Sequence, residues 1–246
     1  ERGVVQLAHR ADGDVVVEVP QETRVGGVPQ LASADAVRFG RVTELIGEQA
    51  AFSYKPLCRK PFLSLPPPSI SDSLPDQERL FREVLRSYPA TVMQIGLSVL
   101  RRLAEVLRKA DWKVTALLGQ RGKTLEVVDI EPGDTSQHNF GVAVDIGTTT
   151  VVAHLVNIND SATVATKAKY NSQIPFGEDI ISRIMCASTP ERREQMKDII
   201  VDDINDLIAA LVVDAKVRLH DVNVVVCAGN TTMIHMLLAL DASNIR

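Results

Sequence analysis

The stretch GVAVDIGTTTVVAHLV, residues 141–156, joins two apolar runs through a short polar turn. Asp145 stands near the end of the first run, and Gly147 opens the turn. The turn continues with three hydroxyl-bearing residues, Thr148, Thr149 and Thr150. Glycine lets backbone approach a ligand closely, and N–H groups and hydroxyls can donate to phosphate. We therefore predict a phosphate-binding hairpin, although an ordinary Thr-rich β-hairpin explains the same letters.

The carboxylate beside this turn extends the prediction. Carboxylate oxygens hold hydrated Mg²⁺ or position water in phosphoryl chemistry. Asp145 is therefore our candidate catalytic residue, and our candidate Mg²⁺ ligand through a bound water.

A second polar turn, AGNTTM at residues 228–233, also follows an apolar run and precedes an expected helix. Open α/β sheets bind ligands at the carboxyl ends of their strands, and helix N-termini favour anions. We predict that four residues of this turn form the facing edge of a phosphate cleft: Gly229, Asn230, Thr231 and Thr232. A simple helix cap by Asn230 or Thr231 is the alternative.

A third stretch, NSQIPFGEDIISRI at residues 171–184, places Glu178 and Asp179 at an expected helix start. Acidic residues there favour the helix dipole, so capping is one interpretation. The other is that these side chains line the cleft.

The flanking sequence from Phe140 onward predicts an α/β fold in the order βββαβα. Apolar alternation and turn residues indicate the strands, and three- and four-residue spacing indicates the helices. Thr189, Pro190 and Glu191 combine a cap, a first-turn proline and a first-turn acid. The expected strands are 141–146, 150–157, 162–169 and 222–228; the expected helices are 177–187, a long one from 190 to about 215, and one after 230.

The preceding half predicts further units. Residues 1–19 have the alternation of a hairpin around Asp12-Gly13, and residues 20–54 have the Pro and Gly content of a linker. Residues 55–137 predict an α+β middle domain, with helices after Pro75 and over about 92–109, then a hairpin. The polar turn EPGDTSQHN leads into the second domain, 138–246.

Composition excludes several classes of protein. The chain has 246 residues and a net charge of -4, which gives no electrostatic case for nucleic acid or an acidic membrane. No apolar run approaches the roughly 20 residues that span a bilayer. The 3 cysteines are far apart, so a reducing cytoplasm fits best, and Cys227 is expected in the core. The five histidines show no metal-ligand spacing.

The first turn resembles the phosphate motif of the ASKHA superfamily, which includes sugar kinases, chaperone ATPases and actin. Together with YNSQIPFGEDIISRI and CAGNTTMIHMLLALD, the chain resembles the reductive activators of corrinoid proteins. The resemblance implies an ATP- and Mg-dependent activator that returns Co(II) corrinoid proteins to Co(I) in methyl-transfer systems. It also implies a homodimer whose partner is the corrinoid protein of a methyltransferase system.

The sequence departs from that family in two ways. The family's N-terminal [2Fe-2S] domain ends in Leu-Ala-Cys, where this chain has Leu7-Ala8-His9, and the other cluster cysteines would precede Glu1. The second ASKHA lobe would follow Arg246. Residues 1–19 then resemble the last ferredoxin hairpin, and residues 138–246 the first part of the nucleotide domain. We expect this chain alone to bind no cluster and to be inactive or very weak as an ATPase.

Two other functions remain open at this point. One is an ASKHA-fold small-molecule kinase, although such kinases normally begin with the phosphate hairpin. The other is a non-enzymatic module that binds a corrinoid protein, which the His9 replacement and the missing lobe favour.

Overall fold

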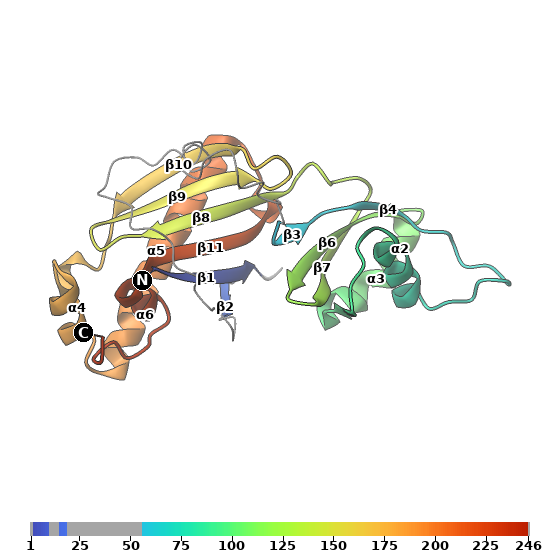
Figure 1. The fold of residues 1–246 in the computed structure, drawn as a ribbon. Coiled ribbons are helices and arrows are strands. Elements are labelled where there is room, and N and C mark those ends of the chain that lie inside the picture. Colours follow the sequence, from blue (N-terminus) through green and yellow to red (C-terminus); the bar gives the residue numbers. More distant parts are fainter. Residues whose placement is uncertain (1, 10–14, 19–55, 246) are drawn as a thin grey trace, which may run out of the picture.

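The structure is a computed structural model that describes residues 2–9, 15–18 and 56–245 of the chain, with side-chain surroundings given for 56–245. Two β-sheets dominate it, one of six strands and one of five, and they lie beside one another along the molecule (Figure 1). The expected α/β class is therefore confirmed. The predicted linker 20–54 and the turn at Asp12-Gly13 lie outside the described residues.

The six-stranded sheet has the strand order β10-β9-β8-β11-β1-β2. β8 and β11 run parallel, and every other neighbouring pair in this sheet is antiparallel. The strands are β1 (Arg2–His9), β2 (Val15–Glu18), β8 (Phe140–Ile146), β9 (Thr150–Asn157), β10 (Thr163–Tyr170) and β11 (Val222–Asn230). The bounds of β8, β9 and β10 match the predicted strands within one residue.

The placement of β1 was not foreseen from the sequence. β1 pairs with β2, as a hairpin over residues 1–19 requires, but it also pairs antiparallel with β11. We had expected residues 1–19 to form a hairpin separate from the sheet of residues 138–246. Val4 and Val5 lie opposite Ala228 and Cys227, so β1 satisfies the backbone groups along that edge of β11.

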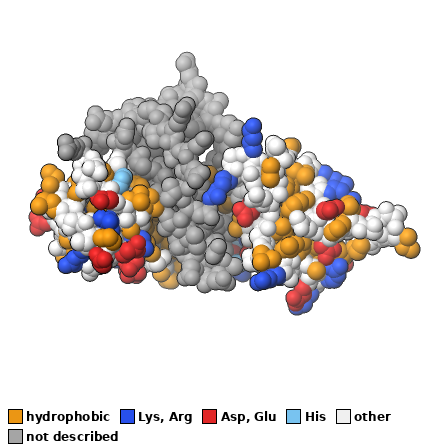
Figure 2. Space-filling view, turned by 90° about the horizontal axis from the view of Figure 1, so that it is seen from below, with side chains coloured by type: hydrophobic (Ala, Val, Ile, Leu, Met, Phe, Trp, Pro, Cys, Tyr) orange, Lys and Arg blue, Asp and Glu red, His pale blue; other side chains and the backbone are white. Residues whose placement is uncertain are grey.

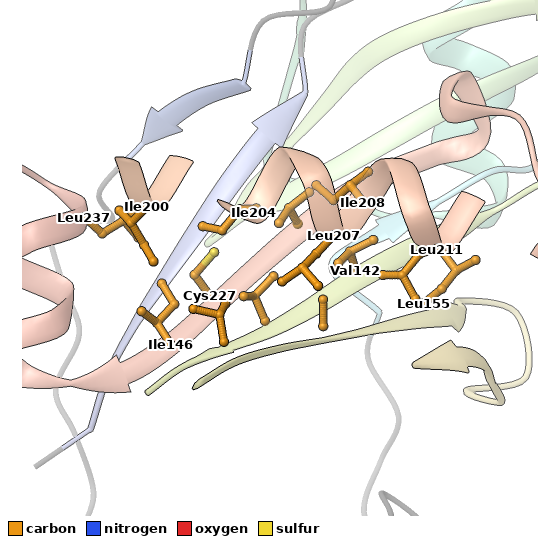
Figure 3. Close-up of a cluster of buried hydrophobic side chains, with 14 of the residues drawn as sticks. Val142, Ile146, Leu155, Ile200, Ile204, Leu207, Ile208, Leu211, Cys227 and Leu237 are labelled. Atoms are coloured by element: carbon orange, nitrogen blue, oxygen red, sulfur yellow. The ribbon is translucent and has the colours of Figure 1, made fainter. Parts of the chain in front are cut away.

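One long helix supplies the apolar cover of this sheet. α5 (Pro190–Ala215) begins after Thr189, whose hydroxyl accepts a hydrogen bond from the Arg192 N–H at 3.4 Å. Its inner side chains pack onto the strands that lie beneath it, as Figure 3 shows. The core residues on α5 are Ile200, Ile204, Leu207, Ile208 and Leu211, and those on the strands include Val142, Ile146, Leu155 and Cys227.

Shorter helices lie at the end of the sheet where the parallel strands β8 and β11 finish. They are the 3-10 turn η2 (Ile174–Phe176), α4 (Ile180–Cys186) and α6 (Thr231–Leu237); a further 3-10 turn, η3 (Leu219–Asp221), leads into β11. Along the chain the elements follow the order β8, β9, β10, α4, α5, β11, α6. This is the predicted βββαβα series, with α4 and α5 as the two helices expected between the third and fourth strands. Figure 1 shows α4 and α6 at the same end of the lobe.

The five-stranded sheet forms the second unit. Four of its strands follow the order β3-β6-β7-β5, and β4 also pairs with β6. The strands are β3 (Cys58–Arg59), β4 (Phe62–Ser64), β5 (Val92–Ile95), β6 (Lys113–Arg121) and β7 (Thr124–Pro132). Two helices, α2 (Asp76–Ser87) and α3 (Leu97–Lys109), share a core with them. The β6–β7 hairpin turns at Gly122, whose φ of 58° favours glycine.

The prediction of one helix over 92–109 was wrong at its start. Residues 92–95 form β5, which pairs in parallel with β7, and the helix begins only after Gly96. Leu103 and Leu107 are buried as the spacing predicted. Leu97 and Leu100, which belonged to the same series, are 62% and 40% exposed. Partners distant in sequence therefore overrode the local helical periodicity.

A polar network joins the two units. Lys60 Nζ lies 2.9 Å from Glu131 Oε1 and donates to the His138 carbonyl at 3.0 Å. His220, at the start of the segment leading to β11, places Nε2 3.3 Å from the same Glu131 oxygen. Burial raises the pKa of the Glu131 carboxyl, but hydrogen bonds from Thr135 and Lys60 outweigh it and hold that pKa below its usual value.

On the face that Figure 2 shows, the described residues carry no single dominant charge. Figure 2 shows acidic, basic and hydrophobic side chains interspersed over the described parts of the face seen from below. Among the described residues, no helix is both long and apolar enough to cross a bilayer.

Candidate functional site

The two polar turns predicted from the sequence lie side by side. β8 and β11 are parallel neighbours, with Ala228 opposite Asp145 and Gly229 opposite Ile146, so both strands end at the same edge of the sheet. A Cβ added to Gly229 would lie 2.9 Å from the Ile146 carbonyl oxygen. Glycine is needed there because a side chain would push the two strand ends apart.

The hairpin turn itself is tight. The Gly147 N–H donates to the Thr150 carbonyl at 3.0 Å. A Cβ on Gly147 would come within 2.5 Å of that same oxygen. Gly147 therefore serves to close the turn, which brings the three threonines together at its tip.

Two buried side chains from the following segment hold the hairpin in place. Asn171 is 1% exposed, donates through Nδ2 to the Gly147 carbonyl at 2.9 Å, and donates through its N–H to the Thr149 carbonyl at 2.9 Å. Arg183, which is fully buried, donates through Nη2 to the Thr148 carbonyl. The carbonyl groups of the turn are thus occupied by protein donors.

The same arginine also reaches the second turn. Arg183 Nε donates to the Gly177 carbonyl at 2.8 Å, and Nη1 lies 3.4 Å from Met233 Sδ on α6. Burial lowers the pKa of this guanidinium and Asp179 raises it, but arginine stays protonated in proteins. A positive charge is therefore fixed directly behind the hairpin, where it favours an anion at the tip.

The hydroxyl groups of the hairpin remain available. Those of Thr148, Thr149 and Thr150 make no hydrogen bond to any residue that the structure describes, and Thr149 and Thr150 are exposed. Because protein donors occupy the carbonyls of the turn, its hydroxyls, which can donate or accept, are the side-chain groups left for a ligand. Their O–H groups can donate to a phosphate.

Asp145 lies on the exposed side of β8, between the buried Val144 and Ile146. Within residues 56–245 its carboxylate forms no hydrogen bond or ion pair, and its titratable neighbour is His154 on β9. Burial lowers the pKa of the His154 imidazole, while the charge of Asp145 raises it. A carboxylate that no protein donor occupies can accept a hydrated cation.

The second turn is built differently. The Asn230 side chain accepts a hydrogen bond from the Met233 N–H at 2.9 Å and so caps α6. Thr232 is only 3% exposed, and the Thr231 carbonyl lies 2.7 Å from His235 Nδ1. The alternative of a helix cap by Asn230 therefore applies. These side chains serve the fold, and the helix they begin has 7 residues.

The third stretch also holds a helix cap. The Asp179 carboxylate accepts from the Ser182 N–H at 2.8 Å, and the two residues form a capping box. These bonds hold the pKa of the Asp179 carboxyl below its usual value. Glu178 is exposed. The stretch does contact the hairpin, but through Asn171 and Arg183.

Sequence reasoning missed those two residues. Neither residue stands out by its type and position alone: one is an asparagine beside a strand end, and the other is an arginine inside an expected helix. The useful signal was that Arg183 stands four residues before Ala187, on the same face of the expected helix, which predicts burial, and a buried arginine needs acceptors.

A possible metal cluster lies elsewhere, at the junction of the two units. Asp129, Glu131 and His220 have ligand atoms that all lie within 4.8 Å of one another. Arg102 already pairs with Asp129, and Lys60 pairs with Glu131. Because two cations neutralise the two carboxylates, the group is an ion-pair network that holds the units together.

The cysteines do not form a cluster site. Cys58 and Cys227 are buried in different sheets, and burial raises the pKa of each thiol to about 12. Cys227 lies in the core, as predicted. A plant-type [2Fe-2S] group takes four Cys thiolates, whereas this chain has 3 cysteines, two of them buried in different sheets, so its cysteines do not fit such a group.

Comparisons with known proteins identify relatives over most of the chain. Residues 47–137 match the model of the RACo linker region, and residues 140–246 match that of the RACo middle region. These two models meet at the polar turn between the two sheets, and they use "linker" and "middle" for the ranges that we had called middle domain and nucleotide domain.

Two individual relatives are similar to the chain. The corrinoid activation enzyme RamQ of Eubacterium limosum is 29% identical over 166 residues, which is 66% of this chain and 28% of that protein. A solved structure of a reductive activator for a corrinoid, iron-sulfur protein superposes with a TM-score of 0.71 at 32% identity, over 80% of this chain and 31% of that one. The chain thus spans about three tenths of the length of either relative.

Proposed function

Because the chain belongs to the RACo family of reductive activators for corrinoid proteins, we propose that it is part of an ATP-dependent activator of this kind. In this proposal the complete protein returns Co(II) corrinoid proteins of a methyltransferase system to Co(I). The present chain contributes half of a nucleotide site and the unit that precedes it.

The observation that carries the proposal is the polarity of the hairpin turn. Asn171 and Arg183 occupy its carbonyl groups, and the hydroxyls of its three threonines bond to none of the residues that the structure describes. Hairpin donors backed by a buried cation suit the phosphates of ATP better than any neutral or cationic ligand.

The residues that would hold the nucleotide follow from this geometry. Thr148, Thr149 and Thr150 would donate to phosphate oxygens, and Asp145 would bind Mg²⁺ through water. A Mg-nucleotide held by these residues would supply the free energy that an uphill electron transfer needs. Gly229 would keep the second turn close to the hairpin, and Asn230 would cap α6 as it does here. No step through a [2Fe-2S] group is assigned to this chain, because its cysteines do not fit one.

Calorimetric titration with Mg²⁺ and a non-hydrolysable ATP analogue tests the nucleotide half of the proposal. The wild-type chain should bind weakly but measurably, and Asp145→Ala should lose at least about tenfold in affinity, as expected when a metal-linked charge is removed. Asp202→Ala, which removes an exposed acid on α5, is the matched control and should bind like wild type. No binding by the wild type, or equal binding by Asp145→Ala, would contradict this assignment.

A second measurement tests the corrinoid half. Surface plasmon resonance with an immobilised Co(II) corrinoid protein should give an affinity that changes when the Mg-nucleotide analogue is added. An affinity that ignores the nucleotide would instead indicate a non-enzymatic binding module. Transfer of the ATP γ-phosphate to a sugar or acid would indicate a small-molecule kinase. The homodimer belongs to the same proposal and is checked by sedimentation equilibrium.

A further inference from the structure

Three buried or half-buried arginines of this protein differ in their hydrogen bonding. Arg79, fully buried, donates to the Pro66, Asp72 and Leu74 carbonyls and to the Asp72 carboxylate. Arg183 is likewise bonded to backbone carbonyls. Arg59 is half-buried, yet it makes no hydrogen bond or ion pair with any residue that the structure describes. Of the three guanidinium groups, it is the one whose donors find no acceptor among residues 56–245.

The Arg59 side chain is nevertheless held in position. Its guanidinium carbon lies 5.2 Å from the centre of the Tyr88 ring. Such stacking is worth about 0.5–1 kcal/mol at exposed sites and leaves the edge of the planar fork free to donate. Arg59 also belongs to β3, which is paired with β6, so its backbone is anchored.

Arg59 and Tyr88 line a cavity of about 220 Å³ at one end of the five-stranded sheet. The cavity lies where the β6–β7 turn meets β3 and the segment before β5. Its lining contains a second cation, Lys123, and no acidic residue. The remaining polar side chains of the lining are hydrogen-bonding groups of Thr91, Gln120 and Thr124.

No carboxylate among the described residues balances the positive charges of this cavity. Lys123, like Arg59, has no carboxylate partner among the described residues. The C-terminus of α2, which ends beside Tyr88, brings a partial charge of about −0.5, well below the two full positive charges. From these observations we infer that the cavity is an oxyanion site, in which Arg59 and Lys123 bind the phosphate or carboxylate group of a small molecule.

The dimensions set the size of the ligand. A water molecule takes up about 30 Å³ of liquid, and pockets for drug-sized ligands measure about 300–1,000 Å³. A cavity of about 220 Å³ therefore holds one phosphate or carboxylate group with a short organic remainder. The guanidinium fork suits two oxygens of such a group at once, while the lysine adds a point charge.

The test uses the full chain labelled with ¹⁵N and titrated with inorganic phosphate or, separately, malonate at constant ionic strength. The amides of Gly122 and Thr124 report on the cavity, and those of Gly147 and Thr149 report on the hairpin, so the two sites are read independently. Saturable shifts at Gly122 and Thr124 are expected, and the anion that saturates them at the lower concentration identifies the preferred group.

Four variants decide which side chains are responsible. Arg59→Gln should weaken binding at the cavity amides by at least about tenfold, as expected for loss of charge-assisted hydrogen bonds. Arg59→Lys, which keeps the charge but not the fork, should give a smaller loss, and Lys123→Gln should also weaken binding. Lys109→Gln removes an exposed cation already paired with Glu105 on the same unit and should change nothing.

Three results would overturn the inference. One is a shift at the cavity amides that stays linear in anion concentration up to tens of millimolar. Another is equal saturation in wild type and Arg59→Gln, given that both spectra keep the dispersion of a folded protein. The third is saturation confined to Gly147 and Thr149, since it would assign the anion to the hairpin.

Discussion

The hairpin turn 147–150 and the strand–helix turn 229–232 have similar residues, but their polar side chains have different roles. Each follows a buried strand and contains a glycine and two or more threonines. In the first, protein donors occupy the carbonyls, and the hydroxyls make no hydrogen bond within the described part of the chain. In the second, Asn230 caps a helix and Thr232 is buried. The difference teaches that polar groups available to a ligand are those that the fold itself does not use.

The largest effect should come from Arg183, which contacts both turns. Arg183→Met fills similar space but leaves the Thr148 and Gly177 carbonyls without their donor. Each buried unsatisfied group costs about 1–3 kcal/mol, so we expect unfolding free energy to fall by about 2–4 kcal/mol. Urea denaturation followed by circular dichroism measures this change.

The control for that variant is Arg192→Met, which removes an exposed arginine from the first turn of α5. Exposed substitutions usually change stability by less than about 0.5 kcal/mol. Equal stability of the two variants would show that the link between the turns contributes nothing.

Asn171 separates the two turns, because it donates to the Gly147 and Thr149 carbonyls of the hairpin and makes no hydrogen bond to the described residues 229–232. Asn171→Asp keeps an acceptor for the Gln173 N–H but places an oxygen against the Gly147 carbonyl. We expect a loss of about 1–3 kcal/mol in the unfolding free energy, with faster hydrogen exchange at Thr148 and Thr149. Exchange that quickens equally at Thr231 and Thr232 would mean that the turns are not independent.

Asn230→Ala probes the second turn in the same way. It removes the acceptor of the Met233 N–H, and loss of an N-cap costs about 1 kcal/mol. Thermal or urea denaturation measures it, and Asn230→Ser should recover most of the loss because serine also caps helices. A stable Asn230→Ala protein that no longer binds nucleotide would reverse the roles we assign to the two turns.

Much of the fold of residues 138–246 could be predicted from local sequence patterns. The hairpin strands, the Thr189 cap and the inner face of α5 follow from alternation, capping chemistry and helical spacing, all of which act within a few residues. The neighbouring placement of the two turns also followed, because parallel strands end at a common edge of a sheet.

The features that the sequence did not predict depend on contacts between residues distant in sequence. β5 pairs with β7 about thirty residues further on, which converted the start of a predicted helix into a strand. β1 pairs with β11 from the opposite end of the chain. Arg183 is recognised as a support of the hairpin only once its distance to Thr148 is known, and no periodicity carries that information.

The central claim is that the hairpin binds the ligand while the second turn serves the fold, and one paired calorimetric measurement tests it directly. The double variant Thr148→Val/Thr149→Val and Asn230→Ala are titrated with the Mg²⁺–ATP analogue and unfolded in urea. We expect the double variant to lose at least about tenfold in affinity with stability changed by less than about 0.5 kcal/mol, because its hydroxyls serve no residue that the structure describes. Asn230→Ala should keep the wild-type affinity at lower stability. Wild-type affinity in the double variant, or lost affinity in Asn230→Ala alone, would contradict the account.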